Sequence, residues 1–479
     1  MTPTVAPNLA SATASRRQFV VGVSSLFAGK AVLASAAAAA STRRRSAVRG
    51  HDVDVVVVGG GFAGVAAARD SMKNGYSTLL LEARDRLGGR TWTADFDGDQ
   101  VELGGTWIHH TQPFVWAEKE RYGLEIEETP GAVADTGYLI ADGERIRLTE
   151  ARYVETYEAW RLYHAEARWI VPRAWDILHN RDAALAADRL SATDHIERLE
   201  LSSLQRSYLR AVIAIMANGQ PETMSYLELM RWHLAGGGFL PTVEDSVARF
   251  KLKRGTRSLL QAMVADAGFE ARLETPVESI RDRGDGAVVV TGAGEEIQCR
   301  AVICCLPMNT IADVAFDPPL AAGVVEAGRQ RHAGAGFKLL LKAEGDVGNV
   351  ATYAIGEPID FVMTYKQAAN YTLLVAFGKD PADLDVNDGD AVQRALRAHV
   401  PRAELIGSMS HDWNGDPYSR GTWAVYRPGW VTRHYDEFQR DRGRILFGSG
   451  DHGEGWRGFI DGAIGGGIRA AQRAKSLLG

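Results

Sequence analysis

The stretch 52–90 constrains the fold more than any other part of the sequence. It begins with the apolar, β-branched run 53–58, which is typical of a strand buried on both faces of a parallel sheet. Three glycines at G-x-G-x-x-G spacing then follow: Gly59, Gly61 and Gly64. A helical run starts at Ala63, and a second short apolar strand, 79–81, ends in Glu82. Strand, glycine turn, helix, strand and acid in this order predict a βαβ unit that binds a dinucleotide.

Each residue of this fingerprint has a physical task. Gly59 permits the tight turn, Gly61 lets the backbone approach a pyrophosphate, and Gly64 lets the helix pack on the strand. The start of the helix offers free N–H groups and the positive end of its dipole to phosphates, and Glu82 can accept hydrogen bonds from ribose hydroxyls. The alternative, an ordinary strand-to-helix turn, would not need the terminal acid. The residues predicted to bind the dinucleotide here are Gly59, Gly61, Phe62, Ala63, Gly64 and Glu82.

Composition and charge restrict the class of protein. The 479 residues are 46% hydrophobic and 24% charged, which is ordinary for a globular protein of two or three domains. A net charge of -6 gives no indication of nucleic acid or an anionic membrane surface as a partner. The cysteines form neither a disulfide framework nor a spaced metal site, so we expect buried thiols and no metal. They are Cys299, Cys304 and Cys305.

Residues 1–45 have the pattern of an export signal rather than of a folded element. Arg16 and Arg17 precede a modestly apolar run and then the small residues 34–40, which predicts a twin-arginine signal with a linker. A disordered basic tail is the alternative. Polar residues interrupt the apolar run, which is shorter than the ~20 residues that a membrane span needs. Because the twin-arginine route carries folded proteins, often with their cofactor bound, we expect a soluble periplasmic or exported protein.

The segment after Glu82 distinguishes a flavin from a nicotinamide. It reads ARDRLGGR over 83–90 and resembles the flavin-containing amine oxidase family, which includes the monoamine oxidases. The resemblance implies that an arginine and backbone amides lie beside an FAD pyrophosphate, a task that suits the planar guanidinium fork. The alternative is a polar loop in which Arg86 and Arg90 are solvated. The resemblance adds these predicted FAD contacts: Ala83, Arg84, Gly89 and Arg90.

Later segments match the same family. The resemblance implies that VELGGTWI, 101–108, passes under the flavin ring, and that a returning strand, 271–277, brings Val277 against the adenine. It also implies that a helix from Ile460 aims its N-terminus at the flavin pyrimidine. Trp107 is expected near the substrate, with a core tryptophan as the alternative. The predicted FAD contacts from these segments are Gly105, Thr106, Trp107, Val277, Trp413, Gly450, Asp451, Phe459 and Ile460.

The resemblance also implies three catalytic residues. Trp423 and Phe459 match the two aromatic rings that sandwich the amine before the flavin, although each alone would be assigned to a core. Lys338 matches a lysine held near flavin N5, where a cation stabilises developing negative charge. The alternative puts Lys338 and Lys342 on a solvated strand face, since they alternate with apolar residues. The predicted substrate contacts are Trp107, Trp423 and Phe459.

Three positions depart from the family pattern. Asp451 stands where a glutamate is usual, so a shorter or water-mediated contact to the cofactor is expected. Thr422 stands where some members carry the cysteine that bonds FAD, which predicts non-covalent FAD. Phe459 replaces a frequent tyrosine and removes a hydroxyl from the aromatic pair.

The predicted fold is mixed α/β, an amine oxidase fold with a Rossmann-like FAD-binding domain and an inserted substrate-binding domain of sheet plus helices. The FAD-binding domain is expected to be discontinuous, over 51–130, 246–310 and 411–479, and the substrate-binding domain to cover 131–245 and 311–410. The helical part of the insertion carries aromatic residues at helical spacing, which we assign to the core rather than to a site. They are Tyr153, Tyr157, Trp160 and His164.

Within the family the chain is most similar to bacterial enzymes of nicotine degradation, in stretches such as VELGGTWIHHTQPFVWAE and SYLELMRWHLAGGGF. The resemblance implies FAD-dependent oxidation of a secondary methylamine of the pseudooxynicotine or nicotine type to an imine. Water then hydrolyses the imine to an aldehyde or ketone plus an amine. Oxygen or a periplasmic electron carrier is the expected acceptor, and a homodimer is one option for assembly.

Other functions remain open at this point. The substrate could be a polyamine, an aromatic monoamine or an L-amino acid, and the last would need an arginine such as Arg427 or Arg457 for its carboxylate. A nicotinamide dehydrogenase would share the phosphate fingerprint but would not need the glycine segment at the C-terminal end. A non-catalytic exported flavoprotein, acting as a redox carrier, is the alternative from another class.

Overall fold

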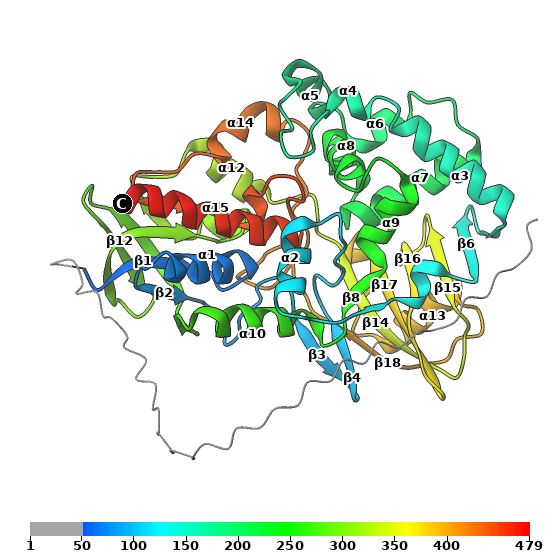
Figure 1. Ribbon diagram of the computed structural model, residues 1–479. Helices are drawn as coiled ribbons and strands as arrows, with labels where there is room; N and C mark the ends of the chain where they lie inside the picture. The colour runs from blue at the N-terminus through cyan, green and yellow to red at the C-terminus, as the bar shows by residue number, and fades with distance from the viewer. Residues whose placement is uncertain (1–50) are drawn as a thin grey trace, which may run out of the picture. The chain divides into compact units, whose positions relative to one another are not determined.

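The computed structural model describes residues 51–479, so the predicted twin-arginine signal at 1–45 lies outside the described residues. Two large sheets organise this part of the chain (Figure 1). The larger one has the spatial order β13 (Ala315–Asp317), β10 (Val277–Asp282), β11 (Ala287–Thr291), β12 (Glu296–Cys304), β1 (Val53–Val58), β2 (Thr78–Leu81) and β9 (Glu270–Arg272), with β19 (Ile445–Phe447) paired to β12.

β1 lies at the centre of this sheet, as its apolar sequence predicts. It pairs in parallel with β12 on one side and β2 on the other. Val55 to Val57 are fully buried because helices α1 (Phe62–Lys73) and α15 (Ile460–Leu478) cover one face and a second apolar cluster covers the other. α1 and α15 lie side by side along β1 in Figure 1. The predicted strand, turn, helix and strand of 53–81 are therefore confirmed.

The second sheet is mainly antiparallel. Its order is β18 (Leu405–Ser410), β14 (Phe337–Glu344), β17 (Tyr371–Gly378), β16 (Phe361–Gln367), β15 (Val350–Ala354), β6 (Thr136–Ala141) and β7 (Glu144–Leu148). Two short ladders complete the strands: β3 (Thr93–Phe96) with β4 (Asp99–Glu102), and β5 (Ile126–Glu128) with β8 (Phe250–Leu252).

A layer of helices over 150–248 packs beside the second sheet (Figure 1). A capping box is present at Ser191, because its hydroxyl accepts a hydrogen bond from the backbone N–H of Asp194 at 3.1 Å. These helices are α3 (Glu150–Tyr163), α4 (Ala167–Ile170), α5 (Arg181–Asp188), α6 (Ala192–Ile196), α7 (Ser203–Ala217), α8 (Tyr226–Ala235) and α9 (Leu240–Ala248).

The remaining helices connect the strands of the two sheets. They are α2 (Pro113–Arg121), α10 (Gly255–Ala267), α11 (Met308–Ile311), α12 (Ala322–Gln330), α13 (Gly389–His399) and α14 (Trp430–Phe438). Short 3-10 turns occur at η1 (Pro130–Val133), η2 (Pro221–Thr223), η3 (Pro381–Asp383) and η4 (Gly450–His452).

The single strand predicted over 271–277 is wrong. β9 ends at Arg272 and β10 begins at Val277. Between them Glu274 has a positive φ of 51°, and Pro276 has no N–H to donate to a neighbouring strand. The domain boundary predicted at 310 also precedes β13, which still pairs with β10 in the larger sheet.

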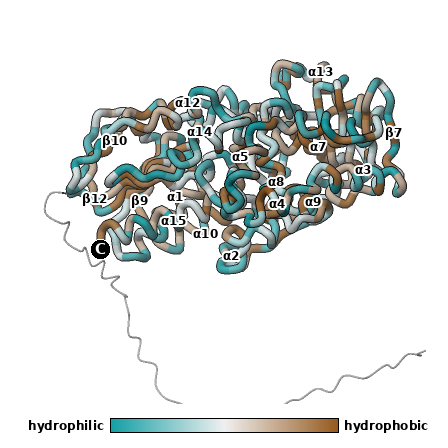
Figure 2. Tube along the Cα trace, turned by 90° about the horizontal axis from the view of Figure 1, so that it is seen from above, coloured by the Kyte–Doolittle hydropathy of each residue, from teal (hydrophilic) through white to brown (hydrophobic). Residues whose placement is uncertain are grey.

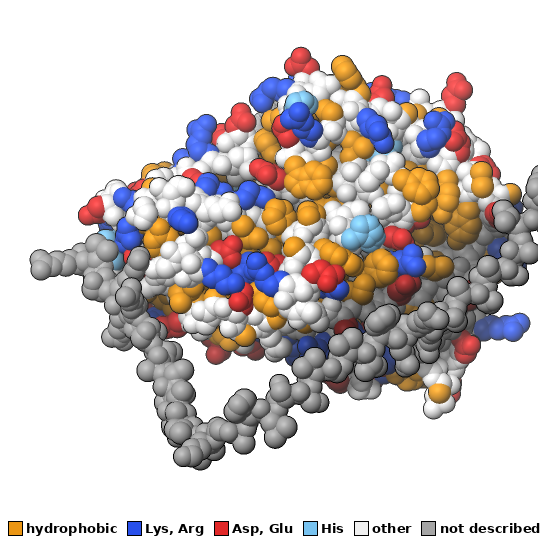
Figure 3. Space-filling model, viewed as in Figure 1, with side chains coloured by type: hydrophobic (Ala, Val, Ile, Leu, Met, Phe, Trp, Pro, Cys, Tyr) orange, Lys and Arg blue, Asp and Glu red, His pale blue; other side chains and the backbone are white. Residues whose placement is uncertain are grey.

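Hydrophobic residues concentrate in the strands beside the labels β9 and β12 in Figure 2, whereas α2 is largely hydrophilic. On the face shown in Figure 3, acidic and basic side chains are interspersed among apolar ones. Cys299 and Cys304 are buried in the core, as expected of inert thiols. None of the helices described within 51–479 is long and apolar enough to span a bilayer. The same residues contain no cluster of His, Cys, Asp or Glu suited to a metal ion.

Replacing Gly64 by Ala is expected to destabilise the folded protein. A Cβ at this position would overlap the carbonyl oxygen of Gly59, so the helix would have to move off the strand, at a cost of about 1–3 kcal/mol. Thermal unfolding of the purified protein measures this cost. Gly389→Ala is the matched control, because a Cβ there meets no atom within 4 Å. An unchanged melting temperature for Gly64→Ala would contradict the packing role.

Candidate active site

One cavity of about 1290 Å³ runs between the larger sheet and the second sheet with its helical layer. Its wall at one end consists of the glycine turn after β1, and at the other end of residues from α3, α7 and α9. Figure 1 shows these helices on the opposite side of the molecule from β1 and α1. The cavity therefore joins the dinucleotide fingerprint to the helical insertion.

The acid at the end of β2 is held in place by backbone groups. The carboxylate of Glu82 accepts hydrogen bonds from the N–H of Gly60 at 2.6 Å and of Arg84 at 2.8 Å. Glu82 is almost completely buried and lines the cavity. Its position relative to the glycine turn is thereby fixed, as a ribose-binding acid requires.

The walls leave room and free donors for a phosphate-bearing group. A Cβ at Gly61 would meet no protein atom closer than 3.8 Å, so the protein itself does not require glycine there. Both α1 and α15 begin on the cavity wall, and neither helix has a side-chain N-cap. Uncapped N-termini with open space before them fit an anionic ligand. The hydroxyl of Thr422, also on the wall, is buried without a hydrogen-bond partner among the described residues.

A buried charge cluster supports Arg90 from behind the wall. Asp451 is fully buried and pairs with the guanidinium of Arg90, with His332 Nε2 at 3.1 Å and with the N–H of Met308 at 2.9 Å. Burial alone would raise the pKa of Asp451, but Arg90 and His332 hold it well below its usual range. Asp451 therefore positions Arg90, which lines the cavity, whereas Asp451 itself does not.

Lys338 also lies behind the wall. Its ammonium donates to the carbonyl oxygen of Gly104 at 2.9 Å and to the hydroxyl of Thr106 at 2.7 Å, and it lies 5.2 Å from the ring of Trp107. Burial lowers the pKa of Lys338 to about 7, although the Glu102 carboxylate opposes this fall. The alternative of a solvated strand face is wrong, since Lys338 and Lys342 are only 7% and 6% exposed.

Trp423 and Phe459 come from two backbone segments that touch. A Cβ at Gly458 would lie 3.0 Å from the carbonyl oxygen of Ala424, so the neighbours of the two aromatic residues are in contact. Trp423 packs edge-on against Phe377 at 6.0 Å, and Phe459 against Trp232 at 5.6 Å between ring centroids. Both rings are half-buried and line the cavity, which gives it an aromatic mid-section.

Most of the residues predicted from the sequence meet on this wall. The predicted residues on the wall are Gly59, Gly61, Phe62, Ala63, Glu82, Ala83, Arg84, Gly89, Arg90, Gly105, Thr106, Trp107, Val277, Trp423, Gly450, Phe459 and Ile460. The other four lie behind it: Gly64, Lys338, Trp413 and Asp451. Trp413 supports the wall by donating its indole N–H to the carbonyl oxygen of Leu103 at 3.0 Å. Whether each residue touches a cofactor stays a prediction.

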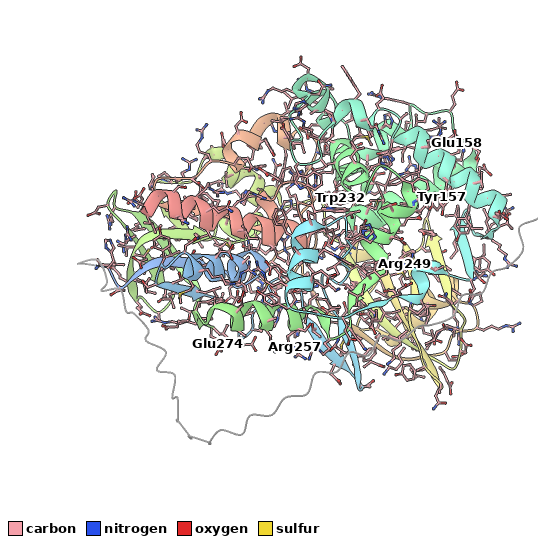
Figure 4. The ribbon with its side chains drawn as sticks, viewed as in Figure 1. Tyr157, Glu158, Trp232, Arg249, Arg257 and Glu274 are labelled. Atoms are coloured by element: carbon pink, nitrogen blue, oxygen red, sulfur yellow. The ribbon has the colours of Figure 1, made fainter. Side chains whose placement is uncertain are left out.

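The sequence missed the far end of the cavity. Tyr153 and Tyr157 of α3 line it, whereas Trp160 and His164 of the same stripe are buried in the core. The assignment of the whole stripe to the core is therefore wrong for its first half. Glu244 of α9 also lines the cavity, and no pattern in the sequence indicated it. In Figure 4 the labelled residues Tyr157 and Trp232 flank α9, one from α3 and one from α8.

Comparison with known families agrees with this geometry. The family described as flavin containing amine oxidoreductase matches residues 62–475. The chain belongs to this family. Pseudooxynicotine dehydrogenase of Pseudomonas sp is 43% identical over 433 residues, which cover 89% of this chain and 87% of that protein. Nicotine dehydrogenase of Pseudomonas putida is 34% identical over 483 residues, covering 97% of this chain and 98% of that protein.

Solved structures share the fold of this amine oxidoreductase. Putrescine oxidase bound to putrescine has a TM-score of 0.77 at 24% identity, covering 88% of this chain and 98% of that chain. Cyclohexylamine oxidase from Brevibacterium oxydans has a TM-score of 0.78 at 18% identity, covering 89% and 99%. The predicted mixed α/β amine oxidase fold is confirmed. Family membership makes the chain a flavin-dependent enzyme, which excludes the nicotinamide dehydrogenase and the non-catalytic carrier.

Replacing Asp451 by Asn is expected to destabilise this amine oxidoreductase by about 1.5–3 kcal/mol at neutral pH, the range for hydrogen bonds to charged groups. The folded-state pKa of Asp451 lies below the ~3.9 of an unfolded aspartate. Its contribution is therefore complete above about pH 4 and is lost as the pH falls further. Thermal unfolding of wild type and variant across this range measures the difference. Asp436→Asn, at an exposed ion pair, is the control. A pH-independent difference would contradict the assignment.

Proposed function

We propose that this enzyme oxidises a secondary methylamine of the pseudooxynicotine or nicotine type, using FAD. The observation that carries the proposal is the single cavity that joins the fingerprint at Gly59–Gly64 to the aromatic residues Trp423 and Phe459. The relatives named for pseudooxynicotine and nicotine support this substrate class, at 43% and 34% identity.

We further propose that the FAD is held without a covalent bond. Thr422 occupies the wall where the sequence resemblance locates a flavin-bonding cysteine in some relatives, and a threonine hydroxyl does not form that bond. The cavity offers contacts for each part of the cofactor. Glu82 can bind a ribose, and the uncapped helix N-termini and Arg90 can bind the negatively charged pyrophosphate.

The chain's own residues bind and orient the amine. When bound, the flavin would serve as the two-electron acceptor of the hydride equivalent that leaves the carbon next to nitrogen. Trp423 and Phe459 hold the amine between aromatic surfaces and exclude water, which favours its neutral, electron-donating form. Lys338, held by Gly104 and Thr106, keeps a proton at Nζ close to the wall. The imine that results is hydrolysed by water to a carbonyl compound and an amine.

An L-amino acid is disfavoured as substrate by the position of the two arginines considered for its carboxylate. Arg457 is buried in an ion pair with Glu228 and stacks on Tyr426 at 3.7 Å. Arg427 donates to the carbonyl oxygens of Arg331 and His332. Neither side chain belongs to the cavity wall formed by the described residues.

Anaerobic mixing of the purified enzyme with an amine panel tests this function. The panel contains pseudooxynicotine, nicotine, tyramine, putrescine and one L-amino acid. Pseudooxynicotine or nicotine is expected to bleach the visible flavin absorbance fastest, because the elongated aromatic cavity fits a heteroaromatic methylamine. Readmitting air then measures whether oxygen is a competent acceptor. Bleaching by tyramine, putrescine or the amino acid alone would replace the proposed substrate class.

We also propose export by the twin-arginine route, on the basis of Arg16 and Arg17. A reporter fused to residues 1–45 is expected to reach the periplasm, and changing both arginines to lysine is expected to abolish export, since the route requires the arginine pair. Cell fractionation measures the distribution of the reporter. Arg43→Lys with Arg44→Lys is the matched control within the same segment. Undiminished export of the Arg16 and Arg17 variant would refute the proposal.

A further inference from the structure

Glu244 is a carboxyl group inside the cavity to which the mechanism assigns no task. It lies on α9, is half-buried and lines the cavity at the end formed by the helical layer. A path of ring contacts leads from Trp423 toward this end. It runs through Phe377, Phe361 and Tyr353 of the second sheet. Glu244 therefore faces the part of a substrate that extends away from the reacting amine.

Aromatic hydroxyl-bearing rings surround this carboxyl. Tyr153 and Tyr157 of α3 lie 6.2 Å apart between ring centroids, and Tyr208 of α7 lies 5.3 Å from Tyr353 of β15. Tyr208 is fully buried, and its hydroxyl donates to Glu244 Oε1 at 3.3 Å. The other three tyrosines line the cavity. Flat rings on several sides make this end suited to a planar aromatic group.

No cationic side chain within 51–479 neutralises Glu244. Its Oε2 forms no hydrogen bond with the described residues, and the charge that acts on its pKa is that of the acidic Asp245. Burial raises the pKa of Glu244 to about 7, a net rise that the Tyr208 hydroxyl opposes and the Asp245 charge supports. Burial and the Glu244 charge also raise the pKa of all four tyrosines, so their hydroxyls stay neutral.

We propose that Glu244 and its tyrosines form a distal subsite for a basic ring nitrogen of the pyridine type, with Glu244 donating a hydrogen bond from Oε2 to that nitrogen. The proposal rests on the proposed function, because it names how the enzyme holds the second end of its amine substrate. It assigns Glu244 a role in substrate specificity and none in the chemical step.

The surroundings favour a neutral heteroaromatic nitrogen over an aliphatic ammonium. A carboxyl that is protonated near neutral pH offers an O–H donor, and a pyridine nitrogen is a pure acceptor that cannot supply its own proton there. An aliphatic ammonium would have to lose its hydration to pair with the Glu244 carboxylate. That carboxylate accepts one long hydrogen bond, from Tyr208, and has no other cation among the described residues to stabilise its charge. The tyrosine rings add stacking surface for a planar ring.

Binding of ligands that lack the amine tests the subsite separately from oxidation. The probes are propyl meta-pyridyl ketone and propyl phenyl ketone, which differ in the ring nitrogen alone. Calorimetric titration of the flavin-loaded enzyme at pH 6 is expected to give a Kd about tenfold lower for the pyridyl ketone. If the enzyme fails to oxidise pseudooxynicotine but shows this difference, the subsite stands and the proposed reaction fails. Equal affinities would overturn the subsite.

Variants identify the side chain that causes the preference for the pyridyl ketone. Glu244→Leu is expected to abolish the pyridyl preference, because no donor remains. Glu244→Gln is expected to keep it, because the amide N–H can donate. Glu158→Leu is the matched control, since Glu158 is exposed on the outer side of α3 beside Tyr157 (Figure 4) and pairs with Arg161. Retained flavin absorbance and melting temperature verify folding. A preference that survives in Glu244→Leu would overturn the assignment.

The pH dependence distinguishes the two kinds of nitrogen. The donor form of Glu244 exists below its pKa, so the pyridyl preference of wild type should fall as the pH rises through about 7. In Glu244→Gln the preference should not vary with pH, because the amide does not titrate. A ligand with an aliphatic ammonium in place of the pyridine that binds more tightly above pH 7, and loses this gain in Glu244→Gln, would overturn the proposal.

Discussion

Close backbone packing through glycine underlies the whole site. α1 is held against the turn after β1 because Gly64 has no Cβ to overlap the carbonyl oxygen of Gly59. On its other side α1 meets α15 at Gly467, where a Cβ would overlap the carbonyl oxygen of Ala63. Two helix N-termini consequently open onto one cavity, and their free N–H groups face the same space. A larger residue at either contact would separate the layers that form the cofactor end.

Two buried ionisable groups support the site from behind the cavity wall. Asp451 and Lys338 stand behind the wall, each held by several partners, while Arg90, Trp423 and Phe459 are on the wall itself. Buried ionisable groups are costly unless they are paired, and the hydrogen bonds of Asp451 and Lys338 help the wall in front of them to keep its shape. This arrangement suits a reaction in which a neutral amine has to be held close to a cofactor and away from water.

The accuracy of the sequence-based predictions follows the range of the interactions involved. The strand, glycine turn and helix around Gly59–Gly64 depend on neighbours a few residues away, and they were predicted correctly. Whether Lys338 is buried or solvated was ambiguous from the sequence. The alternation of residues along a strand separates its two faces but does not show what covers each face. The prediction of one continuous strand over 271–277 failed because a proline and a residue with positive φ interrupt a segment whose composition is typical of a strand.

The sequence by itself determined the dinucleotide fingerprint, because this depends on spacing along the chain. Its resemblance to known amine oxidases implied the family and the aromatic pair Trp423 and Phe459. Only the tertiary structure decided which half of the stripe on α3 faces the cavity, and that Glu244 lies among tyrosines from three other elements. A helix turns every residue to a different direction, so a stripe at helical spacing can meet both the core and a cavity. The pKa of Glu244 is raised by burial among residues that include tyrosines of α3, α7 and β15. These elements become its neighbours only when the chain has folded.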